Sequence, residues 1–187
     1  MNEEKKKKYN FVLDVDGVLT DGSFLYDANG KAYKRFGADD ADALKLISDQ
    51  VNIVFVSADH RGFPITKKRV EDMGFPIEQV KSKDRLQWIH DKFGFENTFY
   101  MGDSFEDIPM LEACIGIAPN NALPDVLSRT DYVCGRAGGD RAVAEACIWI
   151  NSHYLHGSSE WPLREAMKEH GYKFIDDITE NNNGTNN

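Results

Sequence analysis

The sequence predicts an α/β protein with a parallel β-sheet covered by helices on both faces. Short apolar runs, of the kind expected for strands buried on both faces, alternate along the chain with segments of helical periodicity. This alternation favours parallel strands joined by helical crossovers. Because ligands bind such sheets beyond the carboxyl ends of the strands, we expect the functional side chains at that edge.

Four apolar runs are predicted to form strands, and three segments between them are predicted to form helices. The strands are Phe11 to Asp14, Ile53 to Ser57, Thr98 to Met101 and Ile115 to Ala118. The helices, in which apolar side chains recur every three or four residues, are Asp40 to Ser48, Thr66 to Met73 and Arg85 to Phe93. Polar residues follow the strands, since Asp14, Ser57 and Asp103 each fall at or just after a strand end.

The segment 23–36 interrupts the alternation and is predicted to form a β-hairpin. Its two aromatic-rich halves flank Asn29-Gly30, a dipeptide typical of a tight hairpin turn. An apolar hairpin is marginally stable by itself, so it must pack on its own domain or on another subunit. We expect the second arrangement, and therefore an oligomer.

Composition and charge exclude several classes of protein. The chain has 187 residues, 41% of them hydrophobic and 28% charged, which is enough to bury one core without disulfides. The net charge of −9 argues against a nucleic-acid partner. Only a short apolar segment follows the lysines at 5–8, so we expect neither a signal peptide nor a membrane span, and a cytoplasmic location. Three widely spaced cysteines are predicted to be reduced core thiols.

The chain is predicted to contain one main domain with shorter segments at its ends. Residues 1–8 form a basic arm, 9–150 the domain, 151–178 a helical extension and 179–187 a polar, low-complexity tail expected to be disordered. Within the extension, Pro162 lies in the first turn of an expected helix, a position that proline tolerates.

Two carboxylates two residues apart follow the first predicted strand, in Asp14-Val15-Asp16-Gly17. At a strand end one carboxylate and one backbone carbonyl can share a cation while the second carboxylate faces a substrate, which suits metal-assisted phosphoryl transfer. The alternative is a turn with solvated acids, because Asp and Gly are common turn formers.

Ser57 and two lysines are candidates for binding a phosphoryl group. The Ser57 hydroxyl, at the end of a buried strand, can hold a phosphoryl oxygen or merely cap the next helix. Lys81 and Lys83 precede a predicted helix, where a cation is unfavourable for the helix dipole and therefore hints at another purpose. The alternative for both lysines is simple exposure to solvent.

Asp103 and Asp107 follow the third predicted strand at a spacing of four residues. On a helix this spacing places both carboxylates on one face, so that both can reach one cation directly or through its waters. Capping of the helix would explain Asp103 alone and would leave Asp107 without a role.

In chain order, Asp14-x-Asp16-Gly17, Ser57, a lysine and Gly102-Asp103-Ser104-x-x-Asp107 resemble the motifs of the haloacid dehalogenase superfamily of aspartyl-nucleophile phosphatases. The resemblance covers residues 9–150 and implies a Rossmann-like sheet. Within it, the segments 14–22, 35–36, 130–133 and 137–145, together with the hairpin, are similar to the 3-deoxy-manno-octulosonate 8-phosphate phosphatase group. That group has a projecting hairpin in place of a cap domain and is typically tetrameric, so a homotetramer formed through the hairpin is expected.

The resemblance implies a role for each candidate. Asp14 would be the nucleophile that forms an aspartyl-phosphate, and Asp16 the general acid and base. Mg²⁺ would be bound by the Asp14 carboxylate, the Asp16 backbone carbonyl and Asp103, with Asp107 in a supporting position. Ser57 and Lys83, or Lys81 in its place, would neutralise the transferring phosphoryl group.

The expected activity is therefore Mg²⁺-dependent hydrolysis of a sugar phosphate, either 3-deoxy-manno-octulosonate 8-phosphate or a nonulosonate 9-phosphate such as an acylneuraminate ester. Two departures from the family pattern affect substrate choice: Ser57-Ala58-Asp59 replaces Thr-Gly-Arg, and Asp140 replaces a basic residue. They favour, as an alternative, another small phosphate ester. A third alternative is a non-catalytic assembly or regulatory module, against which the presence of both Asp14 and Asp16 argues.

Overall fold

The computed structural model describes residues 8–156 and 162–174. The chain divides into two compact units, Met1–Cys147 and Ile148–Asn187, and the division falls close to the boundary expected at residue 150. The polar tail at 179–187 and residues 1–7 of the basic arm lie outside the described residues.

The first unit contains a six-stranded sheet in which every neighbouring pair is parallel, as predicted. In spatial order its strands are β5 (Ile77–Gln79), β4 (Val51–Ser57), β1 (Tyr9–Leu13), β6 (Thr98–Met101), β7 (Ile115–Ala118) and β8 (Tyr132–Val133). The chain runs outward from β1 to β5 and then returns to the other side of β1. The strand order therefore reverses between β1 and β6, and a crevice opens at such a point beyond the strand ends.

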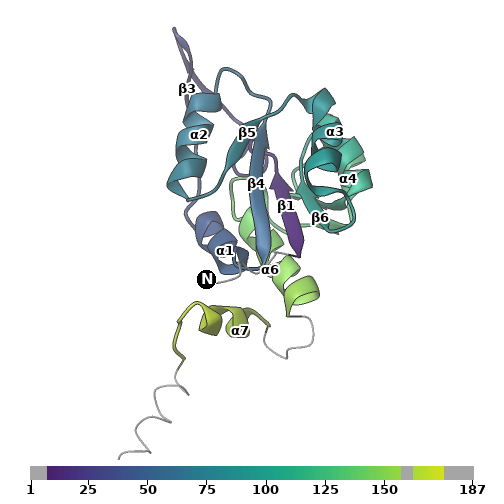
Figure 1. Ribbon diagram of the computed structural model, residues 1–187. Helices are drawn as coiled ribbons and strands as arrows, with labels where there is room; N and C mark the ends of the chain where they lie inside the picture. The colour runs from purple at the N-terminus through teal and green to yellow at the C-terminus, as the bar shows by residue number, and fades with distance from the viewer. Residues whose placement is uncertain (1–7, 157–161, 175–187) are drawn as a thin grey trace, which may run out of the picture. The chain divides into compact units, whose positions relative to one another are not determined.

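Helices cover both faces of this sheet, as the sequence predicted (Figure 1). They are α1 (Asp39–Ile47), α2 (Phe63–Asp72), α3 (Ser82–Phe93), α4 (Ile108–Ala113), α5 (Pro124–Leu127) and α6 (Ala142–Ile150). α1 and α2 lie on one face, and α3 and α4 on the other, which follows from right-handed crossovers in opposite directions. The Ala144 N–H of α6 donates to Asp40 Oδ1 of α1 at 2.9 Å and links these two helices.

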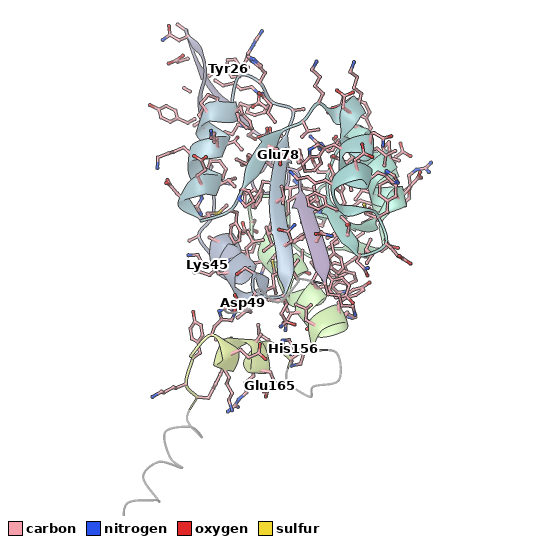
Figure 2. All side chains as sticks on the ribbon, viewed as in Figure 1. Tyr26, Lys45, Asp49, Glu78, His156 and Glu165 are labelled. Atoms are coloured by element: carbon pink, nitrogen blue, oxygen red, sulfur yellow. The ribbon has the colours of Figure 1, made fainter. Side chains whose placement is uncertain are left out.

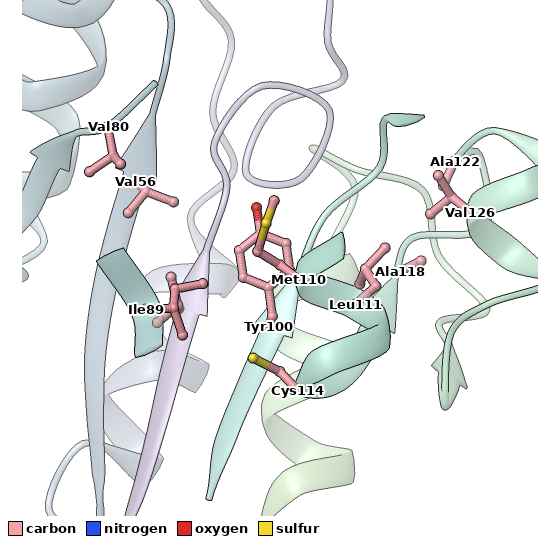
Figure 3. Packing of buried hydrophobic residues seen from close by; sticks show 11 residues of the cluster. Val56, Val80, Ile89, Tyr100, Met110, Leu111, Cys114, Ala118, Ala122 and Val126 are labelled. Atoms are coloured by element: carbon pink, nitrogen blue, oxygen red, sulfur yellow. The ribbon is translucent and has the colours of Figure 1, made fainter. Parts of the chain in front are cut away.

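The core between the sheet and the α3/α4 layer explains the apolar runs (Figure 3). Val56 and Tyr100 point from the central strands toward Ile89 of α3 and Met110 of α4, and Val12 of β1 belongs to the same buried cluster. Their neighbours along the strands, such as Phe11, Leu13 and Phe55, are also fully buried. A central strand covered on both faces needs apolar residues at successive positions, and each large side chain buried contributes about 1.5–3 kcal/mol.

The predicted hairpin is present, with β2 (Leu25–Asp27) and β3 (Gly30–Tyr33) paired antiparallel. Asp27 Oδ1 accepts the N–H groups of Asn29 at 2.7 Å and Gly30 at 3.1 Å, and Gly30 has a φ of 124° that favours glycine. The hairpin follows β1 and projects beyond the carboxyl edge of the sheet, where Tyr26 points outward (Figure 2).

The second unit contains the π-helical segment Asn151–Leu155 and the helix α7 (Pro162–Glu169). The Asn151 side chain donates to the Pro162 carbonyl at 3.0 Å, and the Arg164 guanidinium lies 4.4 Å from the centre of the Phe174 ring. The described part of the expected extension helix is thus confirmed, with proline at its first position.

Two expectations drawn from composition can be checked directly. Cys114, Cys134 and Cys147 are buried and free, as predicted for core thiols. No helix in the described ranges 8–156 and 162–174 is long and apolar enough to cross a membrane.

Candidate active site

A cleft at the carboxyl edge of the sheet collects the predicted acids. Its wall includes six carboxyl groups, from Asp14, Asp16, Asp59, Asp103, Glu106 and Asp107. Among the described residues, Arg85 is the basic side chain that lines this cleft. Such an excess of negative charge is unfavourable by itself and makes the cleft a site for a cation.

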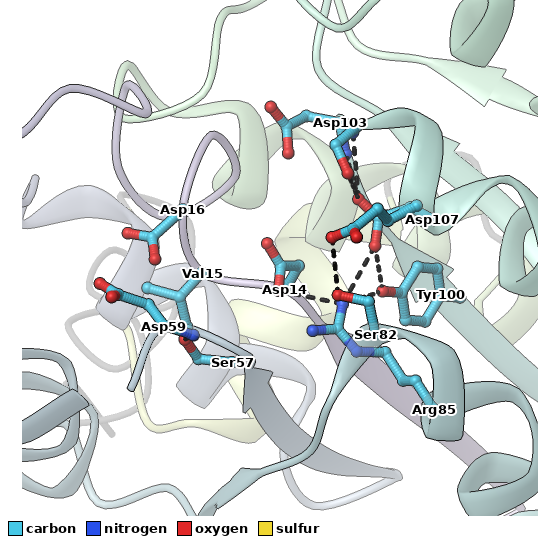
Figure 4. A network of polar contacts seen from close by, with 12 residues as sticks. Asp14, Val15, Asp16, Ser57, Asp59, Ser82, Arg85, Tyr100, Asp103 and Asp107 are labelled. Carbon is cyan, nitrogen blue, oxygen red and sulfur yellow. Dashed lines mark hydrogen bonds and ion pairs between the residues drawn. The ribbon is translucent and has the colours of Figure 1, made fainter. Parts of the chain in front are cut away.

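Asp14 directly follows β1, and its N–H donates to the Met101 carbonyl of β6 at 3.0 Å. Side chains alternate along a strand, so Asp14 shares the face of Val12 and points toward the α3 side. There Asp14 Oδ1 lies 3.1 Å from Arg85 Nη1 (Figure 4). Burial raises the pKa of Asp14 well above its ordinary value, and the nearby acids add to this rise while Arg85 opposes it.

The loop after Asp14 folds tightly and turns Asp16 back over the sheet edge. The Val15 carbonyl accepts three backbone N–H groups, from Val18, Leu19 and Thr20, at 2.9–3.3 Å. Thr20 Oγ1 accepts the N–H groups of Gly17 and Gly22, each at 3.3 Å. Gly17 has a φ of 87°, and a Cβ there would lie 2.0 Å from Asp103 Oδ2, so glycine allows this close approach.

Gly138 and Gly139 support the same loop from behind. The Gly139 N–H donates to the Val18 carbonyl at 3.1 Å, and a Cβ on Gly138 would lie 1.9 Å from the Gly17 carbonyl oxygen. These two glycines therefore allow backbone to pack on backbone behind Asp16.

Replacing Gly138 by alanine should force this loop away and destabilise the fold, by about 1–3 kcal/mol as for other overpacked sites. The measurement is thermal unfolding of the purified variant. The matched control is Gly37→Ala, because a Cβ on Gly37 has its nearest neighbour at 3.6 Å. Equal unfolding temperatures for the two variants would contradict the close approach described above.

Asp107 acts as a buried acceptor that joins three elements of the site. Its Oδ1 accepts Tyr100 Oη at 2.5 Å and Arg85 Nη1 at 3.0 Å. Its Oδ2 accepts the N–H groups of Asp103 and Ser104 and the Ser104 hydroxyl, at 3.0–3.1 Å. Five bonds exceed the roughly four lone-pair sites of a carboxylate, so Asp107 is saturated by the protein.

Asp103 lies beside Asp14, and binding of a cation there would change the protonation of Asp103. Burial and the nearby carboxylates of Asp107 and Asp16 raise the pKa of Asp103 to about 7. Oxygen atoms of Asp14, Asp103 and Asp107 all lie within 4.8 Å of one another. A set of hard oxygen donors with unfavourable mutual repulsion fits Mg²⁺ or a similar divalent cation.

Metal binding should therefore stabilise the fold in a pH-dependent manner. The folded chain binds a proton on Asp103 more tightly than the unfolded chain, so without metal it loses stability as the pH rises from 3.8 to about 7. A divalent cation replaces that proton and reverses the loss. We expect Mg²⁺ to raise the unfolding temperature more at pH 7.5 than at pH 5 in scanning calorimetry, whereas an equal effect at both pH values would contradict this account.

The remaining candidates are Ser57 and the two lysines, and of these only Ser57 is among the residues that line the cleft. Ser57 is buried at the end of β4, lines the cleft, and accepts the Asp59 N–H on its hydroxyl at 3.1 Å. Lys81 and Lys83 are exposed, and Lys83 lines a neighbouring recess with Leu86 and Met110 instead of the cleft around Asp14. The basic group beside Asp14 is Arg85, which the sequence analysis did not select.

The helical spacing of the buried residues in α3 is the sequence pattern that could have identified Arg85. α3 begins at Ser82, three residues before the predicted start at Arg85, so Arg85 and Ile89 form the buried stripe of a helix whose exposed side includes Lys83. The Arg85 side chain is 3% exposed and is held by Asp14, Asp107 and the Tyr100 hydroxyl. These partners raise the pKa of Arg85 although burial alone would lower it, so it stays charged.

Two lysines of the hairpin region form ion pairs with carboxylates of the cleft wall, which the sequence did not predict. Lys34 Nζ lies 2.7 Å from Asp16 Oδ1 and 2.9 Å from Asp59 Oδ2, and Lys31 Nζ lies 2.7 Å from Asp59 Oδ1. Burial by itself would raise the pKa of Asp59, but hydrogen bonds from Lys31, Lys34 and Gly62 lower it to about 2.

The chain is similar in sequence to known proteins. A family model for haloacid dehalogenase-like hydrolases matches residues 85–146. The 3-deoxy-D-manno-octulosonate 8-phosphate phosphatase KdsC of Haemophilus influenzae is 33% identical over 151 residues, which cover 76% of this chain and 83% of the relative. The corresponding Escherichia coli K12 enzyme is 29% identical over 143 residues, covering 73% and 75% of the two chains.

Solved structures agree in fold. The cobalt-bound phosphatase from Haemophilus influenzae has a TM-score of 0.69 at 28% identity, covering 83% of this chain and 98% of that chain. The phosphatase from Moraxella catarrhalis, in complex with magnesium, phosphate and KDO, has a TM-score of 0.68 at 27% identity, covering 79% and 87%.

The chain has a parallel sheet, a group of acids at the switch point where the strand order reverses, and similarity in sequence and fold to known phosphatases. Together these define a phosphoric monoester hydrolase. The chain belongs to the haloacid dehalogenase superfamily, in the group that contains the 3-deoxy-D-manno-octulosonate 8-phosphate phosphatases.

Proposed function

We propose that this enzyme is an Mg²⁺-dependent phosphatase that uses Asp14 as its nucleophile on a keto-deoxy sugar acid phosphate. The observation that carries the proposal is the position of Asp14, which lies between the buried Arg85 guanidinium and the carboxylate of Asp103 at the sheet's switch point. A phosphoryl group bound there meets a nucleophile, a cation-binding acid and a fixed positive charge.

Asp14 and Asp16 carry out the bond-making and proton-transfer steps of this mechanism. Asp14 attacks phosphorus and forms an aspartyl-phosphate as the bond to the sugar oxygen breaks. Asp16 gives a proton to that oxygen and later removes one from the water that hydrolyses the intermediate. The Asp14 carboxylate, the Asp16 backbone carbonyl and Asp103 would hold Mg²⁺, which would supply positive charge to neutralise the phosphoryl group.

The proposal also assigns roles to Asp107, Arg85 and Ser57. Because the protein's own donors saturate both oxygens of Asp107, we assign it to holding Asp103 and Arg85 in place, close to the metal but without a direct bond. Arg85, in place of the expected Lys83, takes the task of neutralising the phosphoryl group, because its guanidinium is in the cleft and Lys83 is not among the lining residues. The buried Ser57 hydroxyl lies in the same wall and can donate to a phosphoryl oxygen.

The choice of substrate rests on the relatives. The curated relatives are phosphatases of 3-deoxy-D-manno-octulosonate 8-phosphate, and the Moraxella catarrhalis structure contains KDO. A nine-carbon keto acid 9-phosphate presents the same carboxylate, hydroxyls and terminal phosphate. Another small phosphate ester is the alternative, favoured by Ala58-Asp59, because Asp59 places a carboxylate in the cleft wall where the family has a basic residue.

Phosphate release from a panel of esters tests the proposal. The panel contains 3-deoxy-manno-octulosonate 8-phosphate, a nonulosonate 9-phosphate and simple hexose phosphates, each with Mg²⁺ and with chelator. We expect turnover that chelator abolishes and that concentrates on one keto acid ester. Even activity across the panel would reject the substrate, and chelator-resistant activity would reject the metal.

We also propose a homotetramer formed through the hairpin. Leu25, Tyr26 and Tyr33 on β2 and β3 are 59–68% exposed, which is a large apolar surface for two short strands. Another copy of the chain would cover it.

Replacing Leu25, Tyr26 and Tyr33 together by serine should dissociate the assembly, because the substitutions remove its apolar contact. Sedimentation velocity gives the mass of the parent and the variant. A parent that sediments as a monomer, or a variant that keeps the parent's mass, would contradict the tetramer.

A further inference from the structure

Lys34 is a buried cation that the mechanism above does not use. It directly follows β3 of the hairpin, and its side chain is 0% exposed. Its ammonium lies 2.7 and 3.0 Å from the two Asp16 oxygens, 2.9 Å from Asp59 Oδ2 and 2.9 Å from Thr66 Oγ1. The ammonium donates hydrogen bonds to Asp16 Oδ2 and Thr66 Oγ1 and forms an ion pair with Asp59, so three side chains fix its position.

The acids of the cleft fall into two groups. Asp16 and Asp59 lie on one side of Asp14, and Asp103 and Asp107 lie on the other (Figure 4). The carboxylates that approach one another as a metal site are those of Asp14, Asp103 and Asp107, without Asp16. A divalent cation beside Asp14 would attract a free Asp16 carboxylate, and Lys34 is the positive charge that holds this carboxylate on the opposite side.

We propose that Lys34 is a positioning residue that holds the Asp16 carboxyl group on the leaving-group side of Asp14. The inference rests on the proposed function, in which Asp16 is the general acid and base. As the Asp14–phosphorus bond forms and the bond from phosphorus to the sugar oxygen breaks, the Asp16 proton moves to that oxygen. A proton donor acts only within hydrogen-bond reach of the acceptor, so its placement decides the rate of this step.

The ion pairs of Lys31 and Lys34 connect the hairpin to the proposed general acid, Asp16. Lys31, within β3, pairs with Asp59, and Lys34 pairs with both Asp59 and Asp16. Thr66 of α2 anchors the Lys34 ammonium from the domain side. The hairpin thereby contributes a side chain that orients the general acid, in addition to the apolar surface that it exposes.

The test compares two leaving groups in the Lys34→Met variant. A sugar alkoxide needs a proton to depart, whereas p-nitrophenolate leaves without one, and kcat/KM reports the step in which the leaving group departs. We expect Lys34→Met to lower kcat/KM for the best sugar phosphate by about 100-fold, the usual contribution of a general acid, and that for p-nitrophenyl phosphate by less than about 5-fold. Lys68→Met, on the exposed side of α2 where Lys68 pairs with Asp72, is the matched control and should change neither value.

The outcomes separate the inference from the proposed function. An equal loss on both esters, or no loss on either, would overturn the positioning role of Lys34. A parent enzyme that releases no phosphate from any sugar ester would instead reject the proposed function. If Lys34→Met does not fold, Thr66→Val removes the anchor of the ammonium while keeping the side-chain shape, and its loss must again be larger for the sugar ester. An equal loss in that variant would overturn the inference too.

Discussion

Asp14→Asn should abolish turnover while keeping the fold. The amide has nearly the shape of the carboxylate but cannot attack phosphorus, so we expect kcat to fall by at least about 10³-fold, as for other lost nucleophiles. Burial raises the pKa of Asp14, which means that its negative charge costs free energy in the folded, metal-free chain. The metal-free variant should therefore unfold at a higher temperature than the parent at pH 7.5.

The control for this prediction is Asp42→Asn on the exposed side of α1, which should change neither turnover nor the response to Mg²⁺. Steady-state phosphate release and calorimetry with and without Mg²⁺ give both quantities. Turnover of Asp14→Asn near that of the parent would remove Asp14 from the mechanism.

Arg85→Met should reduce both activity and stability. Its guanidinium is the cation for the buried Asp107 carboxylate and for the half-buried Asp14 carboxylate, and breaking the buried pair with Asp107 costs about 3–5 kcal/mol. Loss of the fixed positive charge beside Asp14 should lower kcat by about 10²-fold or more. Arg85→Lys should recover part of both losses, because an ammonium lacks the planar fork but keeps the charge.

Lys83→Met and Lys81→Met are the matched controls for Arg85→Met, since both lysines are exposed at the start of the same helix. We expect changes of less than about 3-fold in kcat for each, as for exposed charges. A large loss in Lys83→Met with a small one in Arg85→Met would restore the assignment made from the sequence.

The central strands could be predicted from the sequence because burial on both faces leaves a continuous apolar signal. β6 and β7 begin and end where their apolar runs do. The two edge strands, β5 and β8, were missed. They have three and two residues and are only partly buried, so neither produces an apolar run.

Site residues that lie close together in the sequence could be predicted. Site residues that only the packing of distant segments brings to the cleft could not. Asp14, Asp16, Asp103 and Asp107 stand out because each pair follows a strand end within a few residues. Arg85 was missed because the start of α3 was placed three residues late, which hid its buried stripe.

Lys34 had no local signal at all. Its burial arises only when the hairpin lies against Asp59 and against Thr66, 32 residues further along the chain. Contacts at such separations are set by tertiary structure and not by the pattern of neighbouring residues.

Trapping the phosphorylated intermediate tests the central claim most directly. The enzyme is mixed with Mg²⁺ and an excess of sugar ester labelled with radioactive phosphate, quenched in acid within one turnover, and mapped by peptide mass spectrometry. The account predicts a covalent phosphoryl group on Asp14, which chelator and Asp14→Asn both eliminate. Phosphate release with no labelled protein, or with the label on a different residue, would contradict it.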